Sequence, residues 1–479
     1  MGVLGVRTVE IMVEGGAEGM VRPVLGVIPQ GVADVKVVMC DGGDVDWPGL
    51  VCRTESADKG PSAIQNLRKQ VLKPLVRNGK GYDPAFLRRA CAAAMPTQPV
   101  SDPMTTTSAR RIHLRITPSA STLPSAPPPG LTALLPHLTS LHLTHHALPA
   151  HSTRSLALAL PHATHLTCLA LPHCNLGPAG IACIVAALGK MSAPLTTLDI
   201  SYNISEGADP KVDMDETGGV AYVEPVTAAR LLSTHIRHHG LKELKLAGNA
   251  FTTPGWVAIL DAVGSTRRSS SSPHPTPHVP TTVLDIGGMH LGGVVGALKA
   301  CVGDGDGESP MELDLTRTWV LPRTLAALLS PSSVLTHLTS LTLDAAPSSP
   351  TLHDAGFAIL LNALLAQSQS HTDSNAAPLR HVSAAHQAIT SASAPLLRSA
   401  IGTSRVARWR LCHNQIDDSG VRALLSDNHT CESGTAVVVV VVDLTGNDVS
   451  GECGRWCEDR TGGRGGGVWV VGVGRARRG

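Results

Sequence analysis

Aromatic side chains are scarce in this chain, at 3% of its 479 residues. Proteins that bind single-stranded nucleic acid stack the bases on exposed aromatic rings, so the composition argues against that class. An excess of one charge is also lacking, because 39 Lys and Arg oppose 38 Asp and Glu and the formal net charge is +1. A near-neutral chain has no overall attraction to nucleic acid or to an anionic membrane surface. We therefore expect neither as a partner.

Long apolar runs are missing as well. No stretch reaches the roughly 18 consecutive apolar residues of a membrane-spanning helix, and the N-terminal sequence MGVLGVRTVEIMVEGG lacks the basic and apolar regions of a signal peptide. The eleven cysteines are odd in number and scattered. Such cysteines are typical of reduced, buried thiols in an intracellular protein. The sequence thus predicts a cytoplasmic protein, which we expect to be a monomer.

Enzyme motifs are absent from the sequence. It contains no Gly-x-x-x-x-Gly-Lys-Ser/Thr phosphate loop, no Gly-x-Ser-x-Gly elbow and no His-Glu-x-x-His zinc motif. We expect no catalytic residues and no cofactor.

Two groups of residues have the side chains of a metal site. The first comprises His142, His145, His146 and His151. Strand side chains alternate in direction, so these imidazoles need not converge. The second comprises His429, Cys431, Cys453 and Cys457, which are the residue types that bind zinc. Cys453 falls at a repeat position that Gly occupies elsewhere, which favours a core thiol, and we expect no metal.

One stretch, LKELKLAGNAF at residues 241–251, recurs in modified form through most of the chain. The alternation of Leu244 and Leu246 with polar residues predicts a short strand. Asn249 suits the bend that ends the strand, because its amide can bond backbone groups that no ladder reaches. The apolar run WVAILDAV follows and predicts a helix. Strand, bend and helix form one unit of a solenoid.

The spacing of the units supports this interpretation. Leu138 and Leu166 are 28 residues apart, and Leu166 and Leu195 are 29 apart. A repeat period of 20–50 residues is typical of solenoids. The units start at Ala109, Leu138, Leu166, Leu195, Leu241, Thr281, Pro310, Leu338, Leu379, Val406 and Val439.

These units resemble leucine-rich repeats of the ribonuclease-inhibitor type. The resemblance is carried by LTCLALPHCNLGPAGIACIVAAL (166–188), by LKELKLAGNAF and by WRLCHNQIDDSGVRALL (409–425). The repeat domains of the Ran GTPase-activating protein and of NACHT-type innate immune receptors are similar. The resemblance implies units of one strand and one helix.

Physical spacing predicts the shape of such a stack. Neighbouring strands lie about 4.8 Å apart, whereas neighbouring helices need about 8–10 Å, so the stack bends. We expect an α/β horseshoe solenoid with parallel strands on the concave face and helices on the convex face. Because the strands alternate apolar and polar residues, one face of the sheet stays open.

The chain divides into three predicted regions. Residues 1–100 form an N-terminal cap region of strands followed by basic helices at 61–95, although degenerate repeats are an alternative for its first strands. Residues 101–457 form the leucine-rich repeat domain of about eleven units, and residues 458–479 form a disordered Gly/Arg tail. Loop insertions interrupt the repeats at 205–225, 266–280, 345–355 and 367–378. Substitutions in the insertion at 266–280 are expected to cost almost no stability.

The open strand face is the predicted site, where a protein partner binds. Its charged positions are Asp199, Glu243, Lys245, Asp285, Glu312, Asp314, Asp344, Arg408, Arg410 and Asp443. Most are acidic, which favours steering of a basic protein. The alternative is that each Asp is only hydrated by solvent and hydrogen-bonded to the turn that ends its strand.

A binding surface without catalytic motifs predicts a protein-interaction scaffold or adaptor. The resemblance implies an alternative, a GTPase-activating protein for a Ran-like small GTPase, although the chain lacks the long acidic segment that follows the repeats in that family. A third possibility is an inhibitor that engulfs a basic enzyme, as ribonuclease inhibitor does. The cysteine density expected for that type is not matched here.

Overall fold

The computed structural model describes residues 8–15, 34–41, 111–117, 135–145, 147–205, 223–269, 280–303, 310–330, 333–346, 350–370, 379–425, 440–461 and 468–471. The chain divides into two compact units, Met1–Glu224 (unit 1) and Pro225–Gly479 (unit 2). Some expectations lie outside the described residues: the helices at 61–95, most of the predicted insertions at 205–225, 266–280 and 367–378, much of the tail, and His146, His429 and Cys431.

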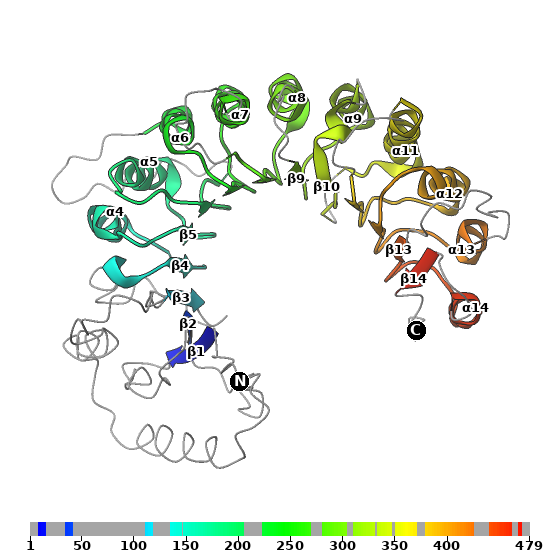
Figure 1. Ribbon diagram of the computed structural model, residues 1–479, viewed down its shortest axis with the longest axis horizontal. Helices are drawn as coiled ribbons and strands as arrows, with labels where there is room; N and C mark the ends of the chain where they lie inside the picture. Colours follow the sequence, from blue (N-terminus) through cyan, green and yellow to red (C-terminus); the bar gives the residue numbers. More distant parts are fainter. Residues whose placement is uncertain are drawn as a thin grey trace, which may run out of the picture. The chain divides into compact units, whose positions relative to one another are not determined.

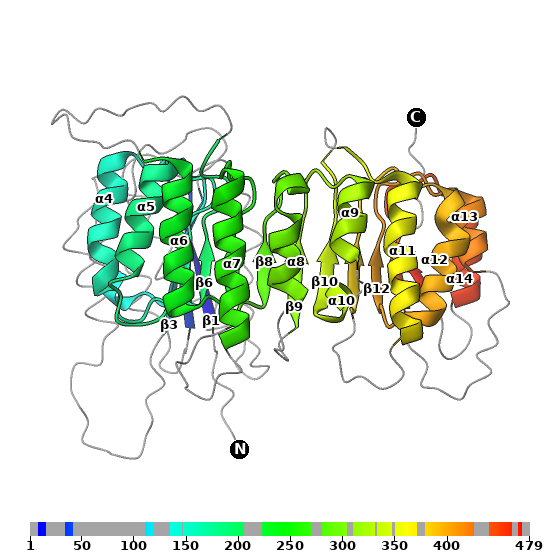
Figure 2. The ribbon, with the colours of Figure 1, turned by 90° about the horizontal axis from the view of Figure 1, so that it is seen from above.

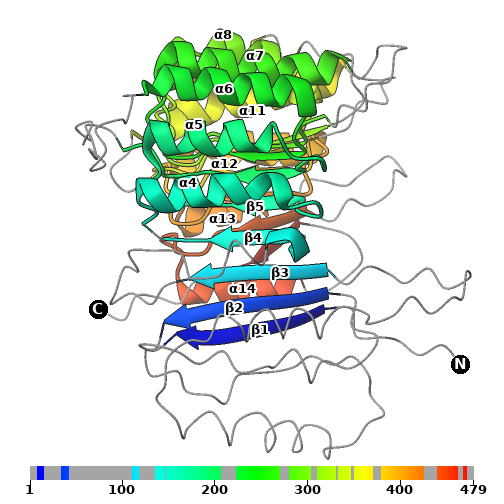
Figure 3. The ribbon, with the colours of Figure 1, turned by 90° about the vertical axis from the view of Figure 1, so that its left-hand side faces the viewer.

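Unit 1 is built on parallel strands that pair in chain order. Figure 3 shows β1 to β5 lying one beside the next, and Figure 1 shows α4 and α5 on one side of β4 and β5. The elements are β1 (Thr8–Gly15), β2 (Asp34–Asp41), β3 (Arg111–Thr117), η4 (Leu135–His137), β4 (Ser140–Leu143), α4 (Ala150–Ala159), η5 (Leu160–His162), β5 (Cys168–Ala170), α5 (Gly177–Leu188) and β6 (Thr197–Asp199).

The two N-terminal strands extend this ladder. Residue Val35 of β2 pairs with Ile112 of β3, and Val37 pairs with Leu114. Strand β1 pairs with β2 in the same parallel sense along its whole length. Both strands therefore have the pairing that the degenerate-repeat alternative requires.

Unit 2 alternates helices and strands in the same way. Its elements are α6 (Pro225–His239), β7 (Glu243–Lys245), α7 (Thr253–Ser269), β8 (Val283–Asp285), η6 (Leu291–Gly293), α8 (Val295–Gly303), β9 (Met311–Asp314), α9 (Pro322–Leu329), α10 (Ser333–Thr336), β10 (Leu338–Thr342), α11 (His353–Ser370), β11 (His381–Ser383), η7 (Ser391–Ser393), α12 (Ala394–Thr403), β12 (Arg408–Arg410), α13 (Asp418–Leu424), β13 (Val440–Asp443), α14 (Gly451–Thr461) and β14 (Val468–Val471).

The strands of unit 2 pair in parallel and in chain order from β7 to β14. Within this unit the strands line the inner side of an arc and the helices its outer side (Figure 1), and the helices stand in a row when seen from above (Figure 2). In the described part of this unit the sheet is open, and the helices lie on one of its faces (Figure 1). The predicted α/β leucine-rich repeat solenoid is confirmed.

One row of buried side chains forms the centre of the core in unit 2. Each comes from the middle of its strand and is at most 1% exposed: Leu244, Leu284, Leu313, Leu341, Val382, Trp409 and Val442. The residues on either side of each point to the open face, because side chains alternate along a strand. Burial of the row fixes which residues the open face presents.

The turns after several strands are held by a side-chain amide. Asn203 in unit 1 accepts from the backbone N of Cys174 (2.9 Å) and donates to the carbonyl of Ile200 (2.8 Å). Asn414 in unit 2 accepts from the N of Gln387 (2.9 Å) and donates to the carbonyl of Ala384 (2.8 Å). These bonds confirm the role expected for the repeated Asn, which links each turn to the preceding repeat.

Helix ends differ from the expected loop boundaries. The sequence predicts an insertion from residue 266, but α7 continues to Ser269, and Thr266 and Arg267 are buried. The reason is packing: the Nη1 atom of Arg267 donates to the carbonyl of Thr281, 3.1 Å away in the next repeat. Helix α11 likewise begins at His353 and ends at Ser370, inside the two later insertions.

The C-terminal segment contains a strand where the sequence predicts a tail without regular structure. Strand β14 pairs in parallel with β13, with Val440 opposite Val468 and Val442 opposite Val470. Alternating valines supply the pattern that such a strand needs. Across the described ranges of the chain, no helix combines the length and the apolar character needed to cross a membrane.

Candidate interaction surface

The open face of unit 2 presents two rows of side chains in register. The first row is Glu243, Val283, Glu312, Ser340, His381, Arg408 and Val441. The second row is Lys245, Asp285, Asp314, Thr342, Ser383, Arg410 and Asp443. Parallel pairing places neighbours in a row about 4.8 Å apart. Eight of the ten predicted site residues therefore share one surface with fixed spacing, and Asp344 lies at its edge.

Charge is divided along these rows. Strands β7 to β9 present the carboxylates of Glu243, Asp285, Glu312 and Asp314, which we call the acidic sector. Strand β12 presents Arg408 and Arg410, on either side of the buried Trp409. Between them, β10 and β11 carry no carboxylate or guanidinium in either row. The face therefore has an acidic part and a basic part rather than a uniform field.

The aspartates of the face close the turns that follow their strands. The Oδ1 atom of Asp314 accepts from the backbone N of Thr316 (2.8 Å) and from its Oγ1 (2.5 Å). Asp285 accepts from the N of Gly287 at 3.0 Å. These are local bonds of the kind that Asp makes two residues along the chain. The turn role that the sequence left open as an alternative is thus present at these positions.

Asp443 repeats this arrangement with Thr445, whose N and Oγ1 donate to its Oδ1 at 3.0 and 2.7 Å. Burial acts to raise the pKa of Asp443, but the hydrogen bonds from Thr445 outweigh it and lower the pKa below its ordinary value. The carboxylate therefore stays charged at neutral pH.

The two glutamates differ from the aspartates. Glu312 is exposed and Glu243 is half-buried, and within the described residues neither makes a side-chain hydrogen bond or an ion pair. They hold no turn. Their carboxylates can therefore contact a partner without breaking a hydrogen bond of the repeat.

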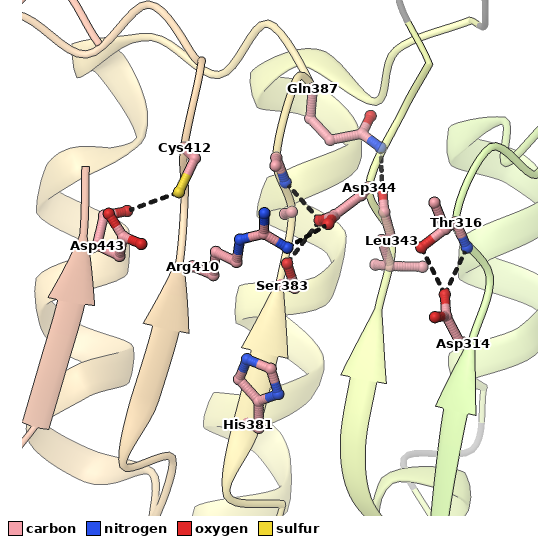
Figure 4. Close-up of polar contacts among 12 residues, drawn as sticks. Asp314, Thr316, Leu343, Asp344, His381, Ser383, Gln387, Arg410, Cys412 and Asp443 are labelled. Atoms are coloured by element: carbon pink, nitrogen blue, oxygen red, sulfur yellow. Dashed lines mark hydrogen bonds and ion pairs between the residues drawn. The ribbon is translucent and has the colours of Figure 1, made fainter. Parts of the chain in front are cut away.

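Asp344 lies two residues after the end of β10, and its carboxylate accepts from three donors (Figure 4). Its Oδ1 accepts from the Oγ of Ser383 (2.6 Å) and from the N of Ala385 (2.8 Å). Its Oδ2 forms an ion pair with the Nη1 of Arg410 at 3.1 Å, with 12% of the Asp344 side chain and 52% of the Arg410 side chain exposed. Arg410 thus reaches across β11 and ties β12 to the end of β10. The charge of Asp344 is therefore largely compensated by Arg410 within the protein.

His381 stands beside Arg408 in the first row and takes no part in the contacts drawn around Asp344 (Figure 4). Its Nδ1 is 3.1 Å from the Oγ of Ser340, which fixes the ring. Burial lowers the pKa of His381, and the neighbouring Arg408 guanidinium lowers it further. The ring is therefore neutral at pH 7 and adds no charge to the surface.

Asp199 is the predicted site residue that belongs to unit 1. It ends β6, in register with Ala170, and its Oδ1 accepts from the N of Ser201 at 3.0 Å. It has the same turn role as the aspartates of unit 2. The remaining predicted residue, Lys245, pairs in register with Asp285.

Stacked rings form a feature that the sequence analysis missed. His386 and His413 stack at 4.5 Å between ring centroids, and His145, His173 and Tyr202 form a similar stack in unit 1 at 4.3 Å for each pair. Each of these residues has a positive φ and comes seven residues after the start of its repeat. That constant offset is the signal that identifies them. No three His, Cys, Asp or Glu side chains gather as a metal site within the described part of the chain.

Comparisons with known proteins bear on the fold. The profile of the family described as "Leucine Rich repeat" matches residues 162–185, from η5 through β5 into α5. No curated protein matches the chain.

Two solved structures are similar at low sequence identity. One is a chain of the crystal structure of the Rad7 and Elc1 complex in yeast, at 14% identity and a TM-score of 0.31, with 72% of this chain and 84% of that chain covered. The other is the plant peptide hormone receptor RGFR1 in complex with RGF2, at 10% identity and a TM-score of 0.26, with 70% and 44% covered. Similarity at this level carries no argument about a ligand or partner.

The matched repeat and the open parallel ladder are those of a leucine-rich repeat solenoid. Each repeat of a solenoid packs on its neighbours and leaves one broad strand face exposed. Such a surface supports a protein-interaction role.

Proposed function

We propose that this protein is a monomeric cytoplasmic scaffold that binds a basic protein partner through the acidic sector of unit 2. The observation that carries the proposal is the register of β8 and β9. Glu312 and Asp314 of β9 lie beside Val283 and Asp285 of β8, so three carboxylates occupy two adjacent strands. Glu243 lies one strand further along the same row. Lys or Arg side chains of a partner complement such a surface.

The glutamates separate this proposal from the structural alternative. Asp285 and Asp314 hold turns, so replacing them changes the fold as well as the charge. Glu243 and Glu312 hold none. A loss of binding on reversing the two glutamates therefore reports on the surface and not on a damaged repeat.

The test compares three forms of the full chain as bait for cytosolic proteins at low and moderate salt. The second form carries Glu243→Lys and Glu312→Lys. The third carries Asp261→Lys on α7 and Glu452→Lys on α14, which are exposed and make the same change in net charge. We expect a basic partner to bind the first and third forms and to be lost from the second, with weaker capture at higher salt because exposed charges are screened.

Equal capture by all three forms would contradict the acidic sector as the binding site. The alternative activity, GTPase activation, is tested by the same captures. A small GTPase that is retained, and whose GTP hydrolysis the full chain accelerates, would identify that activity. In that case Glu243→Lys/Glu312→Lys measures whether the acidic sector contributes to it.

A further inference from the structure

A second charged surface lies further along unit 2 and has the opposite sign. Between Asp373 and Asp417 the sequence contains no acidic residue and no Lys, but it contains five arginines. In a chain whose charges otherwise balance, this segment is locally basic. It spans β11, α12 and β12.

Four of these arginines lie on, or shortly before, two adjacent strands. Arg380 directly precedes β11, Arg405 precedes β12, and Arg408 and Arg410 belong to β12; we call these four the arginine sector. The backbone N of Arg408 donates to the carbonyl of Arg380 at 3.0 Å, which holds the two strand starts together. All four side chains are exposed.

The arginine sector is short of counter-charge. Arg410 has Asp344 as its ion-pair partner, and Asp443 lies beside it in register on β13. Within the described residues no carboxylate forms an ion pair with Arg380, Arg405 or Arg408. Three guanidinium groups are therefore available together, and the nearby His381 ring is neutral at pH 7, since burial and then Arg408 lower its pKa.

The backbone of β12, which carries two of these arginines, is anchored in the core. Trp409 lies between Arg408 and Arg410, is fully buried, and anchors β12 in the core. Arg410 is further held by its bond to Asp344, which occupies one of the five N–H donors of its guanidinium group. The backbone at these two positions and the side chain of Arg410 are thus held before a ligand binds, which reduces the entropy lost on binding.

We propose that the arginine sector is a second binding site, which takes an acidic, extended segment of a protein. Arg408 and Arg410 are two residues apart on one strand, about 6.6 Å at 3.3 Å per residue. An extended peptide with Asp or Glu at alternate positions presents carboxylates at the same spacing. Each carboxylate can accept two parallel N–H bonds from one guanidinium group.

Other anionic ligands fit the surface less well. Single-stranded nucleic acid stacks its bases on exposed aromatic rings, and the indole of Trp409, between Arg408 and Arg410, is buried. A flat membrane cannot reach strands on the inner side of the arc of unit 2 (Figure 1). A peptide strand is narrow enough to lie along the face. The site does not depend on the acidic sector, which is formed by other strands.

The experiment measures binding of a fluorescently labelled peptide with glutamate at alternate positions to the full chain, by anisotropy at two salt concentrations. The variant carries Arg405→Glu and Arg408→Glu. The matched control carries Arg230→Glu on α6 and Arg323→Glu on α9, both exposed, with the same change in net charge. We expect the wild type and the control to bind alike and the variant to lose affinity by about tenfold or more. Equal melting temperatures of the three proteins verify folding.

Equal affinity of the variant and the control would overturn the proposal. Displacement of the peptide by inorganic phosphate at equal charge, or tighter binding of a labelled single-stranded oligonucleotide, would also overturn it in favour of a phosphate or nucleic-acid site. If this proposal is right, the variant Glu243→Lys/Glu312→Lys still binds the acidic peptide. This result does not depend on whether the acidic sector binds a basic partner. Failure of either site can therefore be recognised separately.

Discussion

His235 on α6 is a buried titratable group without a hydrogen-bond partner among the described residues. Its surface is 6% exposed, and neither ring nitrogen is bonded. Its pKa is lowered from 6.5 to about 4, by burial first and by the nearby His239 and His238 in addition. A buried polar ring without partners opposes folding, since its hydration is lost without replacement.

The lowered pKa predicts acid sensitivity of unit 2. Between pH 6.5 and pH 4 the unfolded chain takes up a proton at His235 that the folded chain does not. The free energy of unfolding then falls as pH falls, by up to about 1.4 kcal/mol per pH unit. Above pH 6.5 this loss is absent, because the ring is neutral in both states. Urea unfolding of wild type and His235→Leu across this range measures it.

We expect His235→Leu to be at least as stable as the wild type at neutral pH and to lose less stability on acidification. His151→Leu is the control, because His151 is exposed on α4 and lies on another helix than His235. Parallel pH dependence in wild type and His235→Leu would show that the titration lies elsewhere.

At the scale of single residues, the sequence identifies those positions that recur with the repeat period. The buried row and the turn amides recur at fixed offsets, so they could be located in advance. Gln387 breaks the Asn pattern in the sequence, yet its Nε2 donates to the carbonyl of Leu343 and its Oε1 accepts from the N of Leu352 at 2.7 Å. The longer Gln side chain thus makes the same kind of backbone hydrogen bonds as Asn. A search of the sequence for Asn at this position alone does not find it.

The contact between Arg410 and Asp344 could not be predicted from the sequence. The two residues are 66 positions apart. Their distance depends on the register of three strands, and that register depends on the packing of every residue in the buried row. The presence of both charges on the open face was predictable, whereas their mutual neutralisation was not.

At the scale of elements, the end of α7 shows where composition misleads. Residues 266–272 read TRRSSSS, and polar residues of this kind are typical of loops. Thr266 nevertheless donates its Oγ1 to the carbonyl of Val263 at 2.8 Å, and Arg267 is 2% exposed. The neighbouring repeat supplies the partner for Arg267. A long side chain that finds a carbonyl in the next repeat extends the helix.

We therefore expect Arg267→Ala to destabilise the protein, although the sequence alone predicts almost no effect there. The loss should be about 2–3 kcal/mol, because a buried hydrogen bond from a charged group disappears and the carbonyl of Thr281 loses its donor. Chemical denaturation measures the change. Arg268→Ala, at the exposed neighbouring position, is the control. Equal stability of the two variants would restore the loop interpretation.

At the scale of the whole molecule, a solenoid differs from a globular domain in how a local defect spreads. Each repeat contacts only its neighbours, so stability is a sum of local terms. Leu169 on β5 of unit 1 and Leu313 on β9 of unit 2 are fully buried members of the same repeat position. Replacing either by Ala should cost about 2–5 kcal/mol.

The two substitutions should nevertheless leave different traces in hydrogen exchange. Leu169→Ala should reduce the protection of β4, β5 and β6 and leave β11 to β13 unchanged, whereas Leu313→Ala should reduce that of β8, β9 and β10. Local opening then follows the position of the defect, as expected when cooperative units are small. The same loss of protection throughout the chain in both variants would mean that all repeats unfold together. In that case a destabilising substitution would affect both proposed binding sites, the one on β7 to β9 and the one on β11 and β12. Only the charge-reversal variants would then test each site separately.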